Sequence, residues 1–569
     1  MNARENAPAT LGNLPEIRER RLHRVVEWFR PRCTRKDAIV LLLCILTVIA
    51  SQWWAGCYSG EFVGAGDEAA HFVTGLMVRD YLVSGLGRHP MRFAEEYYFH
   101  YPKVAIGYWP PMFYLLQGVW GAPFTDYRLA VMLLQALLTG LLGWSVYRFL
   151  IGWFDLSVSV AATVLLLMVP QVLNHSRLVM AEILAALLVF WAMAAYGRYL
   201  ETTRWQAALA FGLFSLASLL TKGTGIVLAL LPPVAVLLTR RWHLLSRFSF
   251  WLPALVVLLG AGPWYWLAPG ATNTATVSMG GLGHAPHIRW IALVSIFSIL
   301  GPMLCAFALT GLVERLVRIR QGRAPHGPWT AVIALLVSFL LIPSVIPVIS
   351  VDRRYFIGAV AAMILLSAAG LAFLLDRIPV VWRKPALFVV CAGMFVSQIG
   401  QYRSRVPLGY VDVVRNLAAR SELKDSVYMI VSDGIGEGAV VSEVAMNDRR
   451  PGHVVLRGSK VLGRGSWSGG RMQLVLRTPE QVMRYVESVP VEILITDRGI
   501  RRWFPTDAII ADVLQQYSDR WELIDSYPRP ESSLAKRHIQ VYRLKGVQGK
   551  PRSRIRIDMR NRIDRILEQ

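Results

Sequence analysis

Long apolar runs, separated by short polar or basic loops, dominate the chain from residue 38 to residue 401. About eleven of these runs approach the roughly 17 to 25 residues that a helix needs to cross a bilayer. The predicted spans lie near 38–56, 129–150, 156–173, 179–198, 205–221, 224–239, 249–268, 290–312, 328–349, 355–375 and 383–401. The shorter run 111–124 contains prolines and glycines and is expected to be an interfacial or re-entrant segment. This pattern predicts a polytopic α-helical membrane protein.

After residue 401 the pattern changes to that of a small α/β domain, which we place at 402–545. Short strand-like runs alternate with amphipathic helical stretches, which favours a partly parallel sheet. The strands are expected at 427–433, 453–458, 492–497 and 539–544, and the helices at 436–447, 478–488 and 506–519. The basic tail 546–569 is expected to form an amphipathic helix that contacts an anionic membrane surface or a partner protein.

The composition agrees with a membrane protein and excludes a soluble one. Hydrophobic residues make up 54% of the 569 positions and charged residues only 17%, whereas soluble domains have roughly 25% charged residues. The five cysteines form no CxxC pair, so neither a zinc site nor a disulfide framework is expected. The polar N-terminal segment does not have the pattern of a cleavable signal peptide.

The formal net charge of +23 has an explanation that does not involve nucleic acid. Lysine and arginine concentrate in the N-terminal segment 1–37 and in alternate short loops at 198–204, 240–247, 315–323 and 377–384. Basic loops of membrane proteins lie on the cytoplasmic side. The first loop (57–128) and everything after residue 401 are therefore predicted to lie outside the cytoplasm.

Two acidic side chains in the first loop are the first candidates for chemistry. Asp67 and Glu68 follow Gly64 and Gly66 and begin a helix that is expected to lie on the membrane surface. Asp67 either caps this helix or acts as a carboxylate base at the boundary between water and lipid. His71, one turn further on, could orient that carboxylate, although a surface histidine without such a role would fit the pattern as well.

The same loop continues into an aromatic stretch, 95–114, which surrounds His100 and Lys103 and includes Tyr108. An aromatic belt at the membrane interface would have this composition. Alternatively, the lysine could neutralise the phosphate of a lipid head group.

Further ionisable residues lie at the outer ends of predicted spans. They are Glu182 and the cations Arg177, Lys222, Arg353 and Arg354. Each cation by itself is typical of a snorkelling or topology residue. Together, acids and cations on one side of the membrane suit a reaction with an anionic lipid.

These elements together resemble the GT-C superfamily of polyprenyl-phosphate-sugar-dependent glycosyltransferases, in particular protein O-mannosyltransferases and the bacterial transferase that adds aminoarabinose to lipid A. The resemblance rests on the Asp67-Glu68 pair, the Pro-Pro-aromatic element at 110–114, the RLVMAE element at 177–182 and the TKG element at 221–223, in this order. It covers about residues 38–400 and implies a GT-C-like fold with a C-terminal extracytoplasmic domain.

The resemblance also implies a mechanism and a location. A sugar would pass from a polyprenyl-phosphate carrier to a lipid, glycan or protein acceptor at the periplasmic or external face of a bacterial inner membrane. Asp67 would be the base with Glu68 beside it, Glu182 stands where relatives usually have Asp, and Lys103 with Arg353 and Arg354 would bind the carrier phosphate. Relatives commonly have Lys-Pro-Pro where this chain has Trp109-Pro110-Pro111.

Several alternatives remain open from sequence. A transporter or flippase for lipid-linked substrates also has many spans, although no internal repeat is evident, and a non-catalytic assembly protein is a further alternative. The turn 434–439 matches G-x-G-x-x-A between a strand and a helix, which indicates either a dinucleotide site or simply a tight turn. The outer loop 269–289, which contains His284 and His287, could close over a substrate, whereas a metal there would need further ligands. No cofactor is expected, and a divalent cation is left open.

Overall fold

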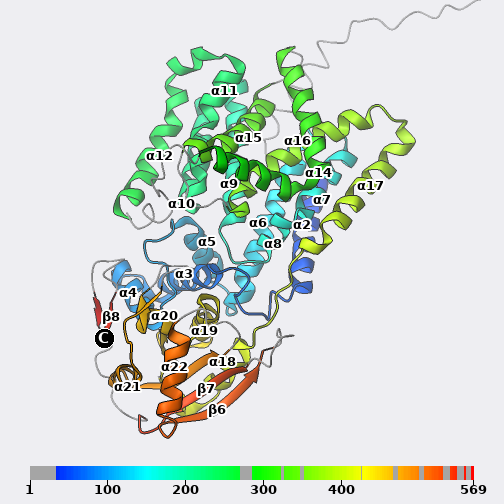
Figure 1. Cartoon of the computed structure of the whole chain (residues 1–569). Coiled ribbons are helices and arrows are strands. Elements are labelled where there is room, and N and C mark those ends of the chain that lie inside the picture. The colour runs from blue at the N-terminus through cyan, green and yellow to red at the C-terminus, as the bar shows by residue number, and fades with distance from the viewer. Residues whose placement is uncertain are drawn as a thin grey trace, which may run out of the picture.

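The computed structural model describes residues 34–268, 285–321, 326–345, 352–424, 426–464, 472–498, 505–529 and 538–547, and two short strands beyond them. Apolar helices form an elongated bundle, and a sheet with its own helices lies at one end of that bundle (Figure 1). The first loop lies between the two. Residues 1–33 of the predicted basic segment 1–37 lie outside the described residues.

Every predicted span corresponds to a helix of the bundle. These helices are α2 (Arg35–Trp54), α6 (Tyr127–Leu150), α7 (Leu156–Met168), α8 (Pro170–Ser176), α9 (Glu182–Thr202), α10 (Trp205–Thr221), η3 (Gly223–Ala229), α11 (Leu231–Thr239), α12 (Phe248–Leu267), α14 (Ala285–Arg320), α15 (Gly327–Val345), η6 (Arg353–Phe356), α16 (Ile357–Leu375) and α17 (Val380–Gln398). Short 3-10 turns follow as η4 (Trp242–Ser246) and η7 (Ile399–Gln401).

The described helices make the chain a multi-pass membrane protein. Seven of them are long and apolar enough to cross a membrane, and the pair α7 and α8, bent by 65°, makes an eighth. Three shorter apolar helices, Trp205–Thr221, Gly223–Thr239 and Gly327–Ile342, account for the other predicted spans. The total of eleven crossings therefore stays a prediction.

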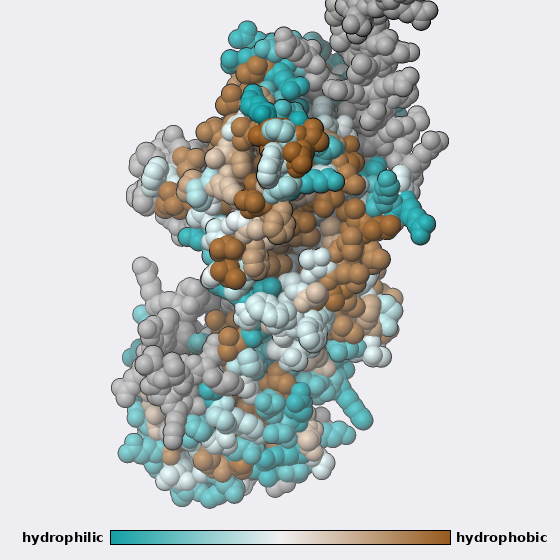
Figure 2. Space-filling model, turned by 90° about the vertical axis from the view of Figure 1, so that its right-hand side faces the viewer, coloured by the Kyte–Doolittle hydropathy of each residue, from teal (hydrophilic) through white to brown (hydrophobic). Residues whose placement is uncertain are grey.

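Burial separates the centre of the bundle from its rim. In the apolar stretches of α9 and α16, 89% of the residues are buried inside the protein. In those of α12 and α17, only 11% are buried. Because an exposed apolar helix is stable in lipid rather than in water, the rim helices present their side chains to the bilayer. Figure 2 shows apolar residues gathered over the helical bundle and polar residues over the end of the molecule that contains the sheet.

Two helices in this bundle approach closely enough for their backbones to touch. Gly311 of α14 lies opposite Gly370 of α16. A Cβ added to Gly311 would collide with the Leu366 carbonyl oxygen of α16, and one added to Gly370 would collide with the Phe307 carbonyl oxygen of α14. Small residues at this crossing allow the two backbones to come into contact. The crossing holds α16, which directly follows η6, the short turn that contains Arg354.

The first loop forms four short helical elements, namely α3 (Glu68–Asp80), η2 (Tyr81–Gly85), α4 (Pro90–His100) and α5 (Met112–Gly121). Helix α3 forms as predicted, but the expected position on the membrane surface is wrong. It packs against α5 on one side and against a helix of the C-terminal region on another, and its residues from Glu68 to Leu76 are all buried. The tertiary fold covers the polar side that sequence periodicity assigned to water.

The C-terminal region contains all the strands and helices expected from the sequence pattern. Its helices are α18 (Tyr410–Ala418), η8 (Ser421–Leu423), α19 (Gly434–Asn447), α20 (Gly458–Val461), α21 (Pro479–Ser488) and α22 (Pro505–Gln516). Its strands are β1 (Val427–Val431), β2 (Val454–Arg457), β3 (Gly463–Arg464), β4 (Gln473–Leu474), β5 (Val491–Arg498), β6 (Trp521–Pro528) and β7 (His538–Leu544). Strands β3, β4 and β6 and the helical elements α18, η8 and α20 were not predicted.

The sheet is partly parallel, as predicted, with strand order β2-β1-β5-β7-β6. Strand β1 pairs in parallel with β2 and β5, in register Tyr428 with Val455 and Tyr428 with Ile493. Strand β7 pairs antiparallel with β5 and β6. The central strand β1 is buried along its whole length, which is expected where both faces of a parallel sheet are covered.

The prediction of a helix in the basic tail is wrong for the residues described there. Arg556–Asp558 (β8) and Ile566–Glu568 (β9) form an antiparallel pair. Apolar residues at 555, 557 and 559 alternate with polar ones, and this period of two suits a strand better than a helix.

Candidate active site

Asp67 of the first loop and Arg354 at the start of the last buried span form an ion pair. The Asp67 Oδ2 atom accepts a hydrogen bond from an Arg354 terminal nitrogen at 3.2 Å. Asp67 occupies the N-cap position of α3, yet its side chain makes no capping hydrogen bond. The interpretation of Asp67 as a helix cap is therefore wrong, and its carboxylate faces the cation instead.

Arg354 contacts three carboxylates that come from different parts of the chain. Besides Asp67, its Nε atom lies 3.9 Å from Glu182 Oε1 and 3.3 Å from the exposed Asp352. Asp352 caps the short turn η6 by accepting the backbone N–H of Arg354. This cap orients the arginine toward the first loop.

Glu182 and Lys222 form the second pair of the site. Glu182 begins α9 and is buried, while Lys222 follows the last residue of α10, and their Oε1 and Nζ atoms are 2.5 Å apart. The other carboxylate oxygen of Glu182 makes no hydrogen bond to any of the residues that the structure describes. The site thus contains two carboxylates and two cations, and Asp67, Glu182, Lys222 and Arg354 were all candidates from sequence.

An aromatic wall closes one side of this group. The His71 ring stacks on Trp109 with centroids 4.1 Å apart, and its Nδ1 atom shares a hydrogen bond of 2.7 Å with the Tyr114 hydroxyl. Burial lowers the pKa of His71 to about 4, so the imidazole is neutral at pH 7. Tyr355 supplies a further ring, whose centroid lies 5.4 Å from Lys222 Nζ and 5.5 Å from Arg354.

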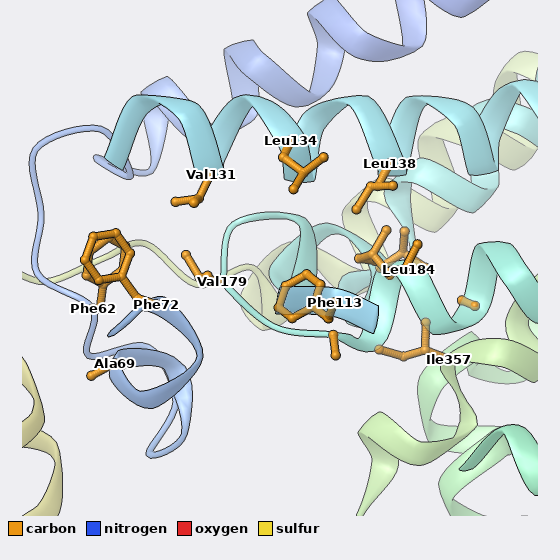
Figure 3. Packing of buried hydrophobic residues seen from close by; sticks show 14 of the residues in the cluster. Phe62, Ala69, Phe72, Phe113, Val131, Leu134, Leu138, Val179, Leu184 and Ile357 are labelled. Carbon is orange, nitrogen blue, oxygen red and sulfur yellow. The ribbon is translucent and has the colours of Figure 1, made fainter. Parts of the chain in front are cut away.

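The aromatic wall and α3 rest on an apolar layer that joins the first loop to the bundle. Phe62 and Phe72 stack with centroids 4.1 Å apart, and Figure 3 shows them facing Val131 of α6, with Phe113 nearer to Leu184 and Ile357. Burial of such rings is the main stabilising contribution here. It places α3, α9 and α16 so that their charged ends converge.

Glu68 does not face this group, although it is adjacent to Asp67. Its carboxylate is fully buried, forms an ion pair with Arg405, and accepts the backbone N–H groups of Gly64 (2.9 Å) and Val179 (3.0 Å). Arg405 was missed by sequence reasoning, because it lies among other arginines just after the last predicted span and no local pattern distinguishes it.

Two candidate substrate-binding residues of the first loop, His100 and Lys103, contact the C-terminal region instead. The His100 Nδ1 atom lies 3.1 Å from the Gly452 carbonyl oxygen. Lys103 is buried and donates to the Gly434 carbonyl oxygen at 3.0 Å. Burial, together with the nearby Arg457, lowers the pKa of Lys103 to about 7.

The three other predicted site residues are Arg177, Tyr108 and Arg353. Arg177 is buried and donates to Ser51 Oγ at 2.8 Å and to the Arg403 carbonyl oxygen at 2.9 Å. The Tyr108 ring packs edge-on against Trp109. Arg353 is exposed next to Arg354. These placements indicate a structural role for Arg177 and leave Arg353 accessible to a ligand.

The glycine-rich turn after β1 has a packing explanation. Asp433 caps α19 by accepting the N–H groups of Ile435 and Gly436. A Cβ at Gly436 would collide with the Tyr410 hydroxyl, and one at Gly438 would come within 3.0 Å of the Lys103 side chain. Of the two interpretations, these contacts favour a tight turn, because they fill the space in which a dinucleotide phosphate would lie.

Among the residues that the structure describes, no three His, Cys, Asp or Glu side chains gather as a metal-binding group. Arg354 lies between Asp67 and Glu182 and contacts both carboxylates. His284 and the side chain of His287 lie outside the part of the chain that the structure describes, so the expectation for this loop stays a prediction. The described cysteines Cys44, Cys57, Cys305 and Cys391 are free thiols.

The helical bundle, the first loop folded over its end and the sheet beyond it together have the GT-C fold. The particular similarity is to ArnT from Cupriavidus metallidurans. The crystal structure of ArnT bound to undecaprenyl phosphate aligns with a TM-score of 0.54 at 14% identity, over 90% of this chain and 99% of that one. The apo form of ArnT aligns with a TM-score of 0.55, also at 14% identity, over 90% of this chain and 100% of that one.

A weaker likeness is to the archaeal oligosaccharyltransferase AglB from Archaeoglobus fulgidus, with a TM-score of 0.47 at 12% identity over 81% of this chain and 69% of that one. No protein-family model matches the chain. No curated protein sequence matches it either.

Proposed function

We propose that this protein is a glycosyltransferase that moves a sugar from a polyprenyl-phosphate carrier to an acceptor at the extracytoplasmic face of the membrane. The observation that carries the proposal is the convergence of Asp67, Glu182, Lys222 and Arg354 at one end of the bundle. These four residues come from distant segments, and they combine a carboxylate base with cations for a phosphate. The GT-C fold and the undecaprenyl phosphate bound by the ArnT neighbour support the same reading.

Asp67 is the proposed general base. Its side chain is 21% exposed, so an acceptor can reach it, whereas Glu182 is 1% exposed. Asp67 would take the proton of an acceptor hydroxyl or amine while the acceptor atom attacks the anomeric carbon of the donor sugar. The bond between that carbon and the phosphate oxygen breaks, and the carrier leaves as polyprenyl phosphate.

Arg354 and Lys222 are the proposed ligands of that phosphate. Both are cations at the end of a span, and the Tyr355 ring lies beside both. Charge that develops on the leaving phosphate oxygen is stabilised by cations held in place before the reaction begins. We assign to Glu182 the role of holding Lys222 and Arg354, and to the exposed Arg353 that of a further phosphate contact.

The extracytoplasmic location is proposed from two properties of the chain. The basic loops predict which side is cytoplasmic, and the first loop lies at the same end of the bundle as the C-terminal region, as that orientation requires (Figure 1). A donor whose isoprenoid chain lies in the bilayer can reach this end from the membrane. The inner membrane of a bacterium is the proposed compartment.

The proposal is tested by reconstitution. Purified protein in vesicles that contain a polyprenyl-phosphate sugar should release polyprenyl phosphate and form a glycosylated product when extracts of envelope lipids, glycans and proteins are offered as acceptors. Movement of the intact donor to the other leaflet without cleavage would instead indicate a flippase. If the protein neither cleaves nor moves any of the donors, the proposal is contradicted.

A further inference from the structure

The residues on either side of the proposed base are held by the segment that links the last span to the sheet. The Glu61 carboxylate accepts the backbone N–H groups of Leu408 at 3.0 Å and Gly409 at 2.8 Å. Glu68, one position after Asp67, pairs with Arg405. Both glutamates are buried, at 1% and 0% exposure, so the linker 405–411 holds the chain before and after Asp67.

Glu68 has no oxygen left for chemistry. Its Oε1 atom accepts from the Val179 N–H and from Arg405, and its Oε2 atom accepts from the Gly64 N–H. To accept a proton from a substrate, the carboxylate would first have to lose these bonds. Glu68 therefore does not suit the role of a second base.

Arg405 extends the same connection to other elements. Its terminal nitrogens also donate to the carbonyl oxygens of Glu61 at 2.6 Å and Arg177 at 2.7 Å, and its guanidinium lies 5.4 Å from the Phe62 ring centroid. Its backbone N–H donates to the carbonyl oxygen of Ala55 at the end of the first span. One side chain thus links the linker to the loop before Asp67 and to the turn before Glu182.

The C-terminal region adds a packed surface behind α3. Helix α19 lies against α3, with Gly438 close to Ala69 and to Lys103, and the Lys103 ammonium donates to the Gly434 carbonyl oxygen. In Figure 1, α3 lies between the bundle and α19. Because α3 is covered on this side, its first turn can move only if the C-terminal region moves too.

The usual ligand position of this kind of sheet is occupied by its own side chains. Parallel sheets bind ligands beyond the carboxyl ends of their strands, where the strand order reverses. Here that position lies between β1 and β5. Asp497 accepts hydrogen bonds there from Tyr410 at 3.1 Å and Ser432 at 3.4 Å and pairs with Arg529. This arrangement suits a supporting element better than a separate binding module.

We propose that Glu68 and Arg405 are positioning residues, through which the linker and the C-terminal region hold Asp67 at the distance from the substrate that transfer requires. The inference rests on the proposed function, because it assigns the role of base to Asp67. It makes the C-terminal region a part of the active site's support.

The test uses Glu68→Gln and Arg405→Lys in the full-length protein. In the first variant the new amide nitrogen would face a backbone N–H donor, and in the second the ammonium would keep the charge but lose the forked donation. Because a displacement of about 1 Å can cost roughly 10²-fold in rate, we expect kcat to fall by roughly 10²-fold, with an unchanged KM for the polyprenyl-phosphate sugar. The exposed pairs supply matched controls, Glu96→Gln beside Arg88 and Arg415→Lys beside Asp412, which should retain wild-type kcat.

The pH profile separates positioning from direct participation. If Asp67 is the base, the acid limb of kcat/KM should persist in Glu68→Gln and Arg405→Lys at reduced height. Loss of that limb in Glu68→Gln would show that Glu68 itself titrates in the reaction, and would overturn the inference. Wild-type kcat in both variants would overturn it as well.

A second measurement does not depend on activity. Hydrogen–deuterium exchange of peptides covering residues 61–75 should be faster in both variants than in wild type, and unchanged in the two controls. Unchanged exchange in folded Glu68→Gln and Arg405→Lys would contradict the anchoring of α3. If wild-type protein transfers no sugar, the proposed function fails, while the exchange result still decides whether this ion pair holds α3.

Discussion

Asp67 and Arg354 are separated by 287 positions in the chain, and their side chains form an ion pair at 3.2 Å at the end of the helical bundle. Asp67 comes from the loop that follows the first span, and Arg354 comes from the start of the next-to-last predicted span, 355–375. A proton acceptor and an anion-binding group thus lie next to each other. Such a pair suits a reaction in which a phosphate leaves as an acceptor loses its proton.

Replacing Asp67 with Asn should reduce transfer by about 10² to 10⁴-fold, the usual contribution of a general base. The neutral amide cannot accept the proton of the acceptor. Binding of polyprenyl phosphate should persist, because Lys222 and Arg354 are retained. Steady-state transfer and lipid-phosphate binding would be measured together, with Asp376→Asn as the control, since Asp376 is exposed and pairs with Arg383 at the other end of α16. Full activity in Asp67→Asn would remove the base assignment.

Replacing Arg354 with Gln should raise the KM for the donor by about 10-fold to 100-fold, because a charged hydrogen bond contributes about 1.5–3 kcal/mol. The donor's phosphate would lose the cation that lies between Asp67 and Glu182. Arg353→Gln, at the exposed neighbouring position, should have a smaller effect. The measurement is donor-dependent initial velocity, and equal effects of the two substitutions would contradict the assignment of Arg354.

Replacing Lys222 with Met should destabilise the protein by about 3–5 kcal/mol, because it leaves Glu182 charged and buried without its closest partner. The double variant Glu182→Met with Lys222→Met should recover most of this loss but no transfer activity. Unfolding of the detergent-solubilised protein would be compared for the single and double variants. A double variant as unstable as the single one would show that the pair itself is not the cause.

His71 should make stability depend on pH in the acidic range. Its pKa is lowered from about 6.5 to about 4 by burial, so between these values the unfolded state binds a proton that the native state does not. Stability should therefore rise by about 3 kcal/mol from pH 4 to pH 6.5 and stay level above that. His71→Asn should lose this contribution, while His243→Asn, at an exposed position, should not. Identical pH dependence in wild type and His71→Asn would contradict the burial argument.

Substitution at the crossing of α14 and α16 should disturb the bundle. Gly370→Ala places a Cβ against the Phe307 carbonyl oxygen, closer than two such atoms can approach, so the helices must separate. The expected cost is about 1–3 kcal/mol, as for other overpacked interiors. Gly393→Ala in α17, where nothing lies within 4 Å of the added Cβ, is the control. The melting temperatures of the two variants would be compared, and equal values would contradict the close contact.

Much of the architecture could be predicted from local patterns. The runs near 38–56 and 355–375 are apolar for as long as a spanning helix requires, and the strands around 427–433 and 492–497 are apolar, short and bounded by turns. These features depend on the solvent around each segment, lipid or protein interior, and hydropathy reports that directly. The helix predicted for the basic tail is wrong because the apolar residues of this short segment fit both the helical period and the period of two of a strand.

The site could be predicted only in part. Asp67, Glu182, Lys222 and Arg354 stood out because ionisable groups at the ends of apolar spans are costly to keep unless they have a function. Their pairing could not be read from the chain. Neither could the fact that Lys103 contacts Gly434.

The sequence by itself determined that this chain crosses a membrane many times, that it carries an α/β region after residue 401, and which charged residues are candidates for a site. Hydrophobic length and charge suffice for those conclusions, because they are properties of single segments. Only the tertiary structure decided that Asp67 pairs with Arg354, whereas Glu68, the next residue, pairs with Arg405, which lies 337 positions further along the chain. Successive residues at the start of a helix point in different directions, so the elements packed on each side of α3 determine which partner each carboxylate finds.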